Sequence, residues 1–410
     1  MRSEETSRIQ GKVVKVLALS QVLSGVGVAG TVAAGSLLVS SISNSETLAG
    51  LAQTTSVLGA AAMALPLSRL TQRGGRRLGL SLGYSIGLLG AIFAVVGGAQ
   101  RILFMMLCGT FMLGAASAAG YQARFAAVDL ATSESRSRQL SFVVWGSTIG
   151  AVAGPNLMEP SGNFAEYIGI PRLVGPYAVA AISLMLVVIV IQLFLRPDPY
   201  LTAIELRDTT KVHHPVLPVK EALALIRKNP AALFAIASIA IGHVAMVSVM
   251  SMTPIHMSHF DATLTIIGLV ISVHVAGMYA FSPIVGFLSD KIGRVRVIQG
   301  GIIILLLSSL VSGTASPHDS ARLGLGLFLL GLGWSCTLIA GSALLSESVE
   351  SHLRPSSQGA SDLVMNLMGA GGGALAGVII GTLGYGWLCL FAAIPVASLG
   401  VWSLKVHTPR

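Results

Sequence analysis

Few side chains of this sequence could bind and release a proton inside its long apolar stretches. No Asp or Glu lies deep in any such stretch, whereas His243 and His274 do, and Asp362 stands at the start of another. A histidine titrates near neutral pH, so it can carry a proton. The alternative roles are a neutral histidine hydrogen-bonded between helices and, for Asp362, a helix cap. These three residues are therefore the candidates for proton coupling.

Other chemistry finds no support in the sequence. It contains no G-x4-G-K-[ST] phosphate loop, no H-E-x-x-H zinc motif and no nucleophile elbow. Cys108, Cys336 and Cys389 each lie in an apolar run, so we expect inert thiols and neither a disulfide framework nor a metal site. We expect no enzymatic activity, no cofactor and no metal, and on the same grounds we do not expect ATP-driven transport.

The composition is that of a membrane protein. Of 410 residues, 53% are apolar and 10% are charged, whereas soluble domains carry about 25% charged residues. The lipid bilayer is therefore the expected surrounding of this chain. The net charge of +9 could suggest nucleic acid, but the placement of the basic residues explains it better, and we expect no nucleic-acid partner.

The elements that must position these groups are transmembrane helices. About 20 apolar residues cross the roughly 30 Å of hydrocarbon. Ten uncharged stretches fit one helix each, and an eleventh, 363–404, is divided in two by a glycine-rich turn at 381–386. The sequence predicts an all-α fold with twelve spans. The ten single stretches are 16–45, 47–68, 78–100, 102–123, 139–158, 173–195, 229–260, 262–289, 297–317 and 323–346.

The basic residues predict the orientation. With a cytoplasmic N-terminus, all of the 26 lysines and arginines except Arg101, Arg172 and Arg322 fall on the cytoplasmic side. Such asymmetry sets membrane topology. We expect both termini in the cytoplasm and a position in the inner (plasma) membrane.

A short charged loop between the eighth and ninth predicted spans carries the most specific pattern. It reads Gly286-Phe-Leu-Ser-Asp290-Lys291-Ile-Gly293-Arg294. This stretch resembles the loop between the second and third helices of each half of major facilitator superfamily transporters, with the pattern G-x-L-a-D-r-x-G-r. Only Lys291 differs, since the family usually has Arg there.

The resemblance covers nearly the whole chain and implies an architecture. It implies two pseudo-symmetric six-helix bundles, at 1–195 and 231–410, joined by a cytoplasmic linker at 196–230. The repeat offset of 218 residues supports this, because it places Gln72 on Asp290 and Asp129 on Glu347. In this family the halves rock about a midplane site in alternating access.

The resemblance also implies a conformational latch formed by Gly286, Asp290, Gly293 and Arg294. In the family the acid lies near the N-terminus of helix 11, beside the loop Arg, and the contacts hold the outward-open state. The alternative is a turn that only shapes the loop. In the first-half copy Gln72 replaces the acid, so we expect no charged latch there.

In that first-half loop Ser68 also replaces the glycine of the pattern. We expect its basic residues Arg73, Arg76 and Arg77 to serve mainly topology.

The fifth predicted span carries Gly146, Gly150, Gly154 and Pro155. Glycines four residues apart form a smooth face that another backbone can approach, and proline bends the helix. This stretch resembles the antiporter motif of drug exporters, although Met158 stands where the family has a further glycine. The pattern favours export over uptake.

The substrate cavity is expected between the halves. In this family helices 1, 4, 7 and 10 line it, and helices 2, 5, 8 and 11 lie at the interface. The polar candidates are Gln21, Arg124, Trp145 and Asn366. Arg124 could bind an anionic group or pair with Asp129, but snorkelling to the interface is favoured. The apolar remainder suits a lipophilic substrate.

The sequence thus resembles bacterial twelve-helix drug:proton antiporters. The expected function is export of small, lipophilic molecules by a monomeric secondary active transporter, coupled to proton influx. The expected partners are a small-molecule substrate and protons. One alternative is an uptake carrier or uniporter for a small metabolite. Another is a receptor or scaffold of the same fold that binds a ligand without flux.

Overall fold

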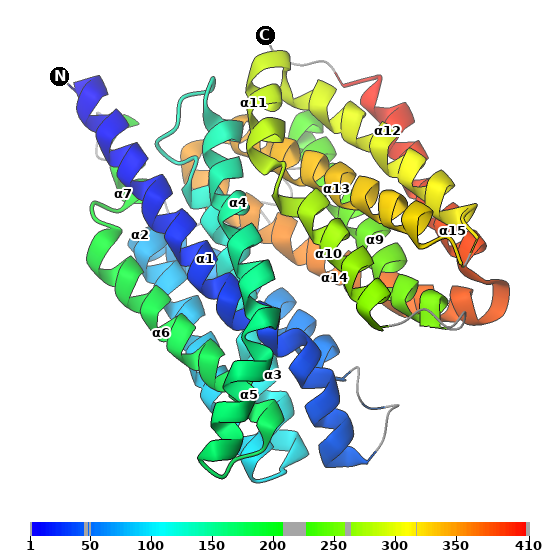
Figure 1. Cartoon of the computed structure of the whole chain (residues 1–410). Coiled ribbons are helices and arrows are strands. Elements are labelled where there is room, and N and C mark those ends of the chain that lie inside the picture. Colours follow the sequence, from blue (N-terminus) through cyan, green and yellow to red (C-terminus); the bar gives the residue numbers. More distant parts are fainter. Residues whose placement is uncertain are drawn as a thin grey trace. The chain divides into compact units, whose positions relative to one another are not determined.

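The computed structural model describes residues 2–44, 48, 51–207, 227–258, 264–316 and 318–406, and in these it contains helices and no strands. Figure 1 labels the elements. The helices are α1 (Arg2–Ser43), α2 (Leu51–Ala99), α3 (Leu103–Ala126), α4 (Arg136–Asn156), α5 (Met158–Tyr167), η2 (Arg172–Val174), α6 (Gly175–Phe194), α7 (Pro199–Arg207), α9 (Pro230–Ser258), α10 (Leu264–Tyr279), α11 (Ser282–Ile292), α12 (Arg294–Gly313), α13 (Ser320–Ser348), η3 (Ser351–Leu353), α14 (Arg354–Leu383) and α15 (Tyr385–Ser403).

These helices match the predicted membrane spans. Ten of the described helical segments are long and apolar enough to cross a membrane, and the bent pair Arg136–Gly154 and Met158–Tyr167 makes an eleventh. One of the ten, α2, is 49 residues long and is interrupted at Gly75, so it provides two spans. The fold is the predicted all-helical, multi-pass membrane fold with twelve spans.

Glycines with positive φ mark three of the breaks between spans, at Gly75, Gly293 and Gly384. Gly384 (φ 91°) separates α14 from α15, as the sequence predicts. Gly75 (φ 83°) interrupts α2, and the charged stretch at 69–77, which the sequence suggests as a loop, is otherwise helical. Only glycine adopts such backbone angles at low cost, so a single residue can turn the chain without a loop.

The chain forms two compact units, and each takes a short segment from the other half of the sequence. Unit 1 comprises residues 1–131, 146–219 and 351–363. Unit 2 comprises 132–145, 220–350 and 364–410. The start of α14 therefore packs with the first-half helices, and the start of α4 with the second-half helices. The predicted division by a linker at 196–230 stays a prediction, because 208–226 lie outside the described residues.

Glycines lie at close helix contacts in each unit. In unit 1, α2 packs along α3, and Cβ atoms at Gly90, Gly97 and Gly109 would stand 2.5–2.6 Å from backbone atoms of the facing helix. In unit 2, α13 packs against α9, α10 and α12. Without a hydrophobic driving force between helices in lipid, such close backbone contact supplies the packing energy.

Candidate functional site

A buried ion pair in unit 1 joins the end of α3 to the start of α14. Arg124, in the last turn of α3, places Nη2 2.6 Å from Oδ1 of Asp362, and both side chains are 2% exposed or less. The pair connects residues 238 positions apart in the chain. A charge-assisted hydrogen bond of this length is among the stronger polar contacts in a protein.

This geometry corrects two expectations. The preferred reading of Arg124 as a residue that snorkels to the interface was wrong, because the guanidinium is buried against a carboxylate. Asp362 does not cap its helix, because α14 begins eight residues earlier, at Arg354. Aromatic rings complete the surroundings of the arginine: its Cζ lies 4.6 Å from the ring centre of Phe125 and 5.5 Å from that of Tyr121.

A second buried ion pair lies in the same unit. Arg76 donates from Nε and Nη2 to the two carboxylate oxygens of Asp129, at 2.7 and 3.1 Å, and from Nη2 to Oε1 of Gln358 at 2.7 Å. Arg76 is 1% exposed. The expectation that this arginine serves mainly topology was therefore wrong, and Asp129 pairs with Arg76 rather than with Arg124.

The first turns of α14 carry a row of polar contacts to the first-half helices, which we call the α14 seam. Ser356 bonds with the side-chain amide of Gln72 at 2.7 Å. Gln358 and Asp362, one turn apart, meet Arg76 and Arg124. The seam therefore fixes residues 351–363 to unit 1, although the rest of α14 belongs to unit 2.

Asp290 lies at the N-terminus of α4 in unit 2. Its carboxylate accepts hydrogen bonds from the backbone N–H groups of Ser137 and Arg138, at 2.9 and 2.8 Å. The first turn of α4 contains no acid of its own, so Asp290 supplies the negative charge that the positive end of the helix dipole favours. The family-based expectation of helix 11 as the partner was wrong, because the second-half loop meets the fifth span.

Arg294 completes this network. It lies 3.0 Å from Asp290 and 2.7 Å from Glu347, and it also donates to the backbone carbonyl of Ser133. Arg136 reaches the same Glu347 at 3.5 Å. The predicted pairing of the loop acid with the loop arginine is confirmed, and Glu347 extends it into a four-residue charge network.

Two latch glycines allow this approach. Gly286 packs against α4, where a Cβ would stand 2.6 Å from the carbonyl oxygen of Ser137. Gly293 has φ 100° and links α11 directly to α12. The four predicted latch residues therefore come together at one helix terminus, while their role as a latch stays a prediction.

The glycines of α4 pack against α1 in unit 1. A Cβ at Gly25 would stand 2.9 Å from Cα of Gly150, and one at Gly30 would stand 3.0 Å from the carbonyl oxygen of Gly154. Gly146 likewise faces the backbone of Ala18. The predicted close backbone approach is confirmed. Pro155 lies in α4 just before the chain bends by 50° into α5.

The two candidate histidines are both in unit 2 and have different surroundings. His243, in α9, accepts a hydrogen bond at Nδ1 from Nε1 of Trp334 at 3.2 Å and packs against Gly369 of α14. His274, in α10, is fully buried and its Nδ1 lies 2.8 Å from the carbonyl oxygen of Leu327. Both fit hydrogen-bonded neutral histidines between helices.

The remaining cavity candidates are scattered. Gln21 is buried and donates to the carbonyl oxygen of Gly120 at 2.8 Å. Asn366 is buried in α14, and Trp145 is 40% exposed on α4. No group of three or more potential metal ligands occurs in the described part of the chain.

Sequence reasoning missed Arg76 and Gln358 as members of a buried network. The repeat offered a signal for Arg76, because a shift of 218 residues places Arg76 and Asp129 on Arg294 and Glu347. No pattern in the sequence connects Gln358 with Arg76, 282 residues away.

Comparison with known proteins shows the family of this chain. The family model "Major Facilitator Superfamily" matches residues 17–261 and 244–410. An uncharacterized MFS-type transporter of Bacillus subtilis, YddS, is 34% identical over 396 residues, covering 95% of this chain and 90% of YddS. The riboflavin transporter RfnT of Brucella anthropi is 25% identical over 356 residues, covering 85% and 84% of the two chains.

A solved structure shows the same fold. The proton:xylose symporter XylE superposes with a TM-score of 0.75 at 14% identity, covering 98% of this chain and 96% of that one. Together, the family model and the relatives identify the chain as a membrane transporter of the major facilitator type. The chain belongs to the major facilitator superfamily.

Proposed function

We propose that this transporter exports small lipophilic molecules in exchange for protons and that Asp362 is the proton-binding site. The observation that carries the proposal is the buried Arg124–Asp362 pair. It contains a buried carboxylate two turns into α14, a helix long and apolar enough to span the membrane, and ionisable groups within such helices are candidates for functional sites.

The pair supplies a means of coupling. A proton on Oδ1 or Oδ2 of Asp362 removes the negative charge that compensates Arg124. A buried cation without its partner is unfavourable by several kcal/mol, so Arg124 must find a new partner or the α14 seam must open. Because α14 begins in unit 1 and continues in unit 2, opening the seam changes the contacts of a helix shared by both units. Protonation and conformation are then linked reciprocally.

Export is supported by the glycines of α4 and by the apolar character of the membrane spans. Gly150 and Gly154 bring α4 against the backbone of α1, as the resemblance to the antiporter motif implies. The seventh span, α9, has Met246 and Val249 buried with His243 as its one titratable side chain between 232 and 255. We expect an apolar helix of this kind to suit the path of a lipophilic substrate. We propose that the protein lies in a bacterial inner membrane with both termini on the cytoplasmic side.

The experiment is a measurement of internal pH in proteoliposomes with an imposed proton gradient. The added compounds are tetraphenylphosphonium, chloramphenicol, xylose and riboflavin. Proton movement that requires one of the lipophilic compounds, and that disappears in Asp362→Asn but persists in the surface variant Glu166→Gln, is expected. Substrate flux without proton movement would contradict proton coupling.

A second candidate function is uptake of a polar metabolite. It is favoured by the similarity to RfnT, which is a riboflavin transporter. The direction of flux separates the two. Accumulation of riboflavin inside cells that express the protein would support uptake, whereas reduced accumulation of tetraphenylphosphonium supports export. Binding without flux of any compound would instead support a receptor of the same fold.

A further inference from the structure

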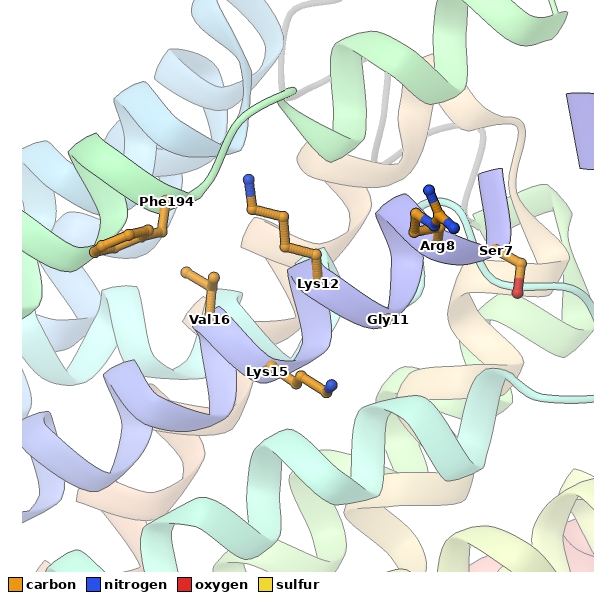
Figure 2. Close-up of a pocket in the computed structure, with 7 residues that line it drawn as sticks. All are labelled: Ser7, Arg8, Gly11, Lys12, Lys15, Val16 and Phe194. Carbon is orange, nitrogen blue, oxygen red and sulfur yellow. The ribbon is translucent and has the colours of Figure 1, made fainter. Parts of the chain in front are cut away.

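A hollow of about 530 Å³ lies beside the N-terminal part of α1, where the helix meets the end of α6. Figure 2 shows the basic side chains spaced along α1, with Phe194 of α6 across from Lys12 and Val16. The hollow is separate from the Arg124–Asp362 pair and takes no part in the proposed proton pathway. Its lining residues are Ser7, Arg8, Gly11, Lys12, Lys15, Val16 and Phe194.

The polar part of the hollow is positively charged. Arg8, Lys12 and Lys15 are exposed and follow the i, i+4, i+7 spacing that places residues on one face of a helix. None of the three forms an ion pair with a carboxylate among the described side chains. Lys12 donates to the backbone carbonyl of Arg196 at 3.0 Å, which ties α1 to the end of α6. Three basic residues therefore line a space to which the described part of the chain contributes no acidic side chain.

Gly11 contributes open space to the hollow. No heavy atom lies within 4 Å of the position that a Cβ would take there, so the missing side chain leaves a gap between Arg8 and Lys15. Beyond the basic residues the lining turns apolar, with Val16 buried and Phe194 exposed. The uncharged membrane stretch of α1 begins at Val16. The hollow thus lies at the boundary between the polar and apolar parts of a membrane.

We propose that this hollow binds the headgroup of an anionic phospholipid. The basic residues would hold the phosphate, the gap at Gly11 would admit the headgroup, and Phe194 would contact the first carbons of an acyl chain. Basic pockets between transmembrane helices are suited to anionic headgroups, and each Lys or Arg at the surface of an anionic membrane strengthens binding by about fivefold. Long basic side chains also reach the interface from an apolar helix without bending it.

The test uses the full-length protein in detergent micelles and counts bound lipids by native mass spectrometry. The probes are phosphatidylglycerol, phosphatidylcholine and soluble glycerol phosphate. We expect phosphatidylglycerol to bind preferentially. Arg8→Gln/Lys12→Gln/Lys15→Gln should weaken that binding by about 100-fold if the three charges contribute additively. Gly11→Leu, which fills the gap and keeps every charge, should weaken it by at least tenfold.

A matched control removes the same number of charges elsewhere. Arg69→Gln/Arg227→Gln/Lys228→Gln takes away three exposed basic residues outside the hollow and should leave phosphatidylglycerol binding within twofold of the parent protein. Equal loss in both triple variants would overturn the proposal, because binding would then follow net charge alone. Unchanged binding in Gly11→Leu would also overturn it. Equal binding of glycerol phosphate and phosphatidylglycerol would exclude a lipid as the ligand.

Discussion

The charged loop of the second half and its counterpart in the first half occupy equivalent positions but make different contacts. Each contains an arginine that pairs with an acid 53 residues later: Arg76 with Asp129, and Arg294 with Glu347. Each loop also contains a glycine with positive φ: Gly75 interrupts α2, and Gly293 follows the end of α11. The first-half pair is 1% exposed on both sides, whereas Glu347 is 26% exposed. The repeat therefore keeps the ion pair and varies its depth.

The second difference concerns the helix terminus that each loop meets. Asp290 accepts hydrogen bonds from the N–H groups of Ser137 and Arg138. The equivalent positions, 218 residues later, are Pro355 and Ser356. Proline has no N–H, so an acid in place of Gln72 would lose one of its two donors, and Gln72 instead bonds with the hydroxyl of Ser356. The neutral side chain of Gln72 therefore suits a helix that has a proline in its first turn and offers a serine hydroxyl as its partner.

The comparison predicts that the first-half pair matters most for stability. Arg76→Ala leaves Asp129 as a buried carboxylate without its bidentate partner, which should destabilise the protein by about 3–5 kcal/mol. Arg294→Ala should be milder, because Arg136 still reaches the more exposed Glu347. Thermal unfolding in detergent, followed with a thiol-reactive dye, measures both.

A double variant provides the control for this prediction. Arg76→Met/Asp129→Leu removes both charges together and should recover most of the lost stability, since apolar replacement of a buried pair is often neutral. A double variant as unstable as Arg76→Ala would contradict the electrostatic account and leave loss of packing as the cause.

The next largest effect is expected at Asp290. Asp290→Asn removes the charge from two hydrogen bonds and one ion pair. In the parent protein these contacts should favour the conformation in which Asp290 meets α4 by about 1.5–3 kcal/mol. A population shift of that size should lower the transport rate by about tenfold or more. Gln72→Ala loses one neutral hydrogen bond and should change the rate by less than threefold. Equal rates in the two variants at equal expression would remove the latch role of Asp290.

The smallest effect tests the partner helix itself. Gln72→Asp alone should lower stability by about 1 kcal/mol, because the new carboxylate faces Pro355 and finds only one N–H donor. Gln72→Asp/Pro355→Ala should restore the loss by providing the second donor. If adding Pro355→Ala to Gln72→Asp does not restore stability, the missing N–H of Pro355 does not explain why residue 72 is a glutamine. Unfolding midpoints of the parent protein and the two variants decide this.

The sequence predicts the spans and their breaks well, for physical reasons that act locally. An uncharged stretch of about 20 residues must cross the bilayer, and Gly384 ends α14 where the glycine-rich turn is predicted. Contacts between distant helices are harder to predict. Arg124 could be satisfied by water at the interface or by a carboxylate, and nothing near it in sequence indicates Asp362, 238 residues away.

The partial symmetry of the two halves explains why the partner helix of Asp290 was predicted wrongly. The motif of the second half predicts a carboxylate at a helix N-terminus, but the motif alone does not determine which helix. The structure shows that α4 is that partner and that its own first turn contains no acid. The first turn of α14 contains no acid either, so no local feature of the sequence distinguishes the two candidate partner helices.

The most direct test of the proposed coupling compares two transport modes of Asp362→Asn in proteoliposomes. The first mode is accumulation of tetraphenylphosphonium in these proteoliposomes driven by a proton gradient that is acidic inside. The second mode is exchange of labelled for unlabelled compound without any gradient. We predict that Asp362→Asn loses gradient-driven accumulation and keeps exchange, while Glu166→Gln keeps both. Gradient-driven accumulation at the parent rate in Asp362→Asn would show that the proton binds elsewhere.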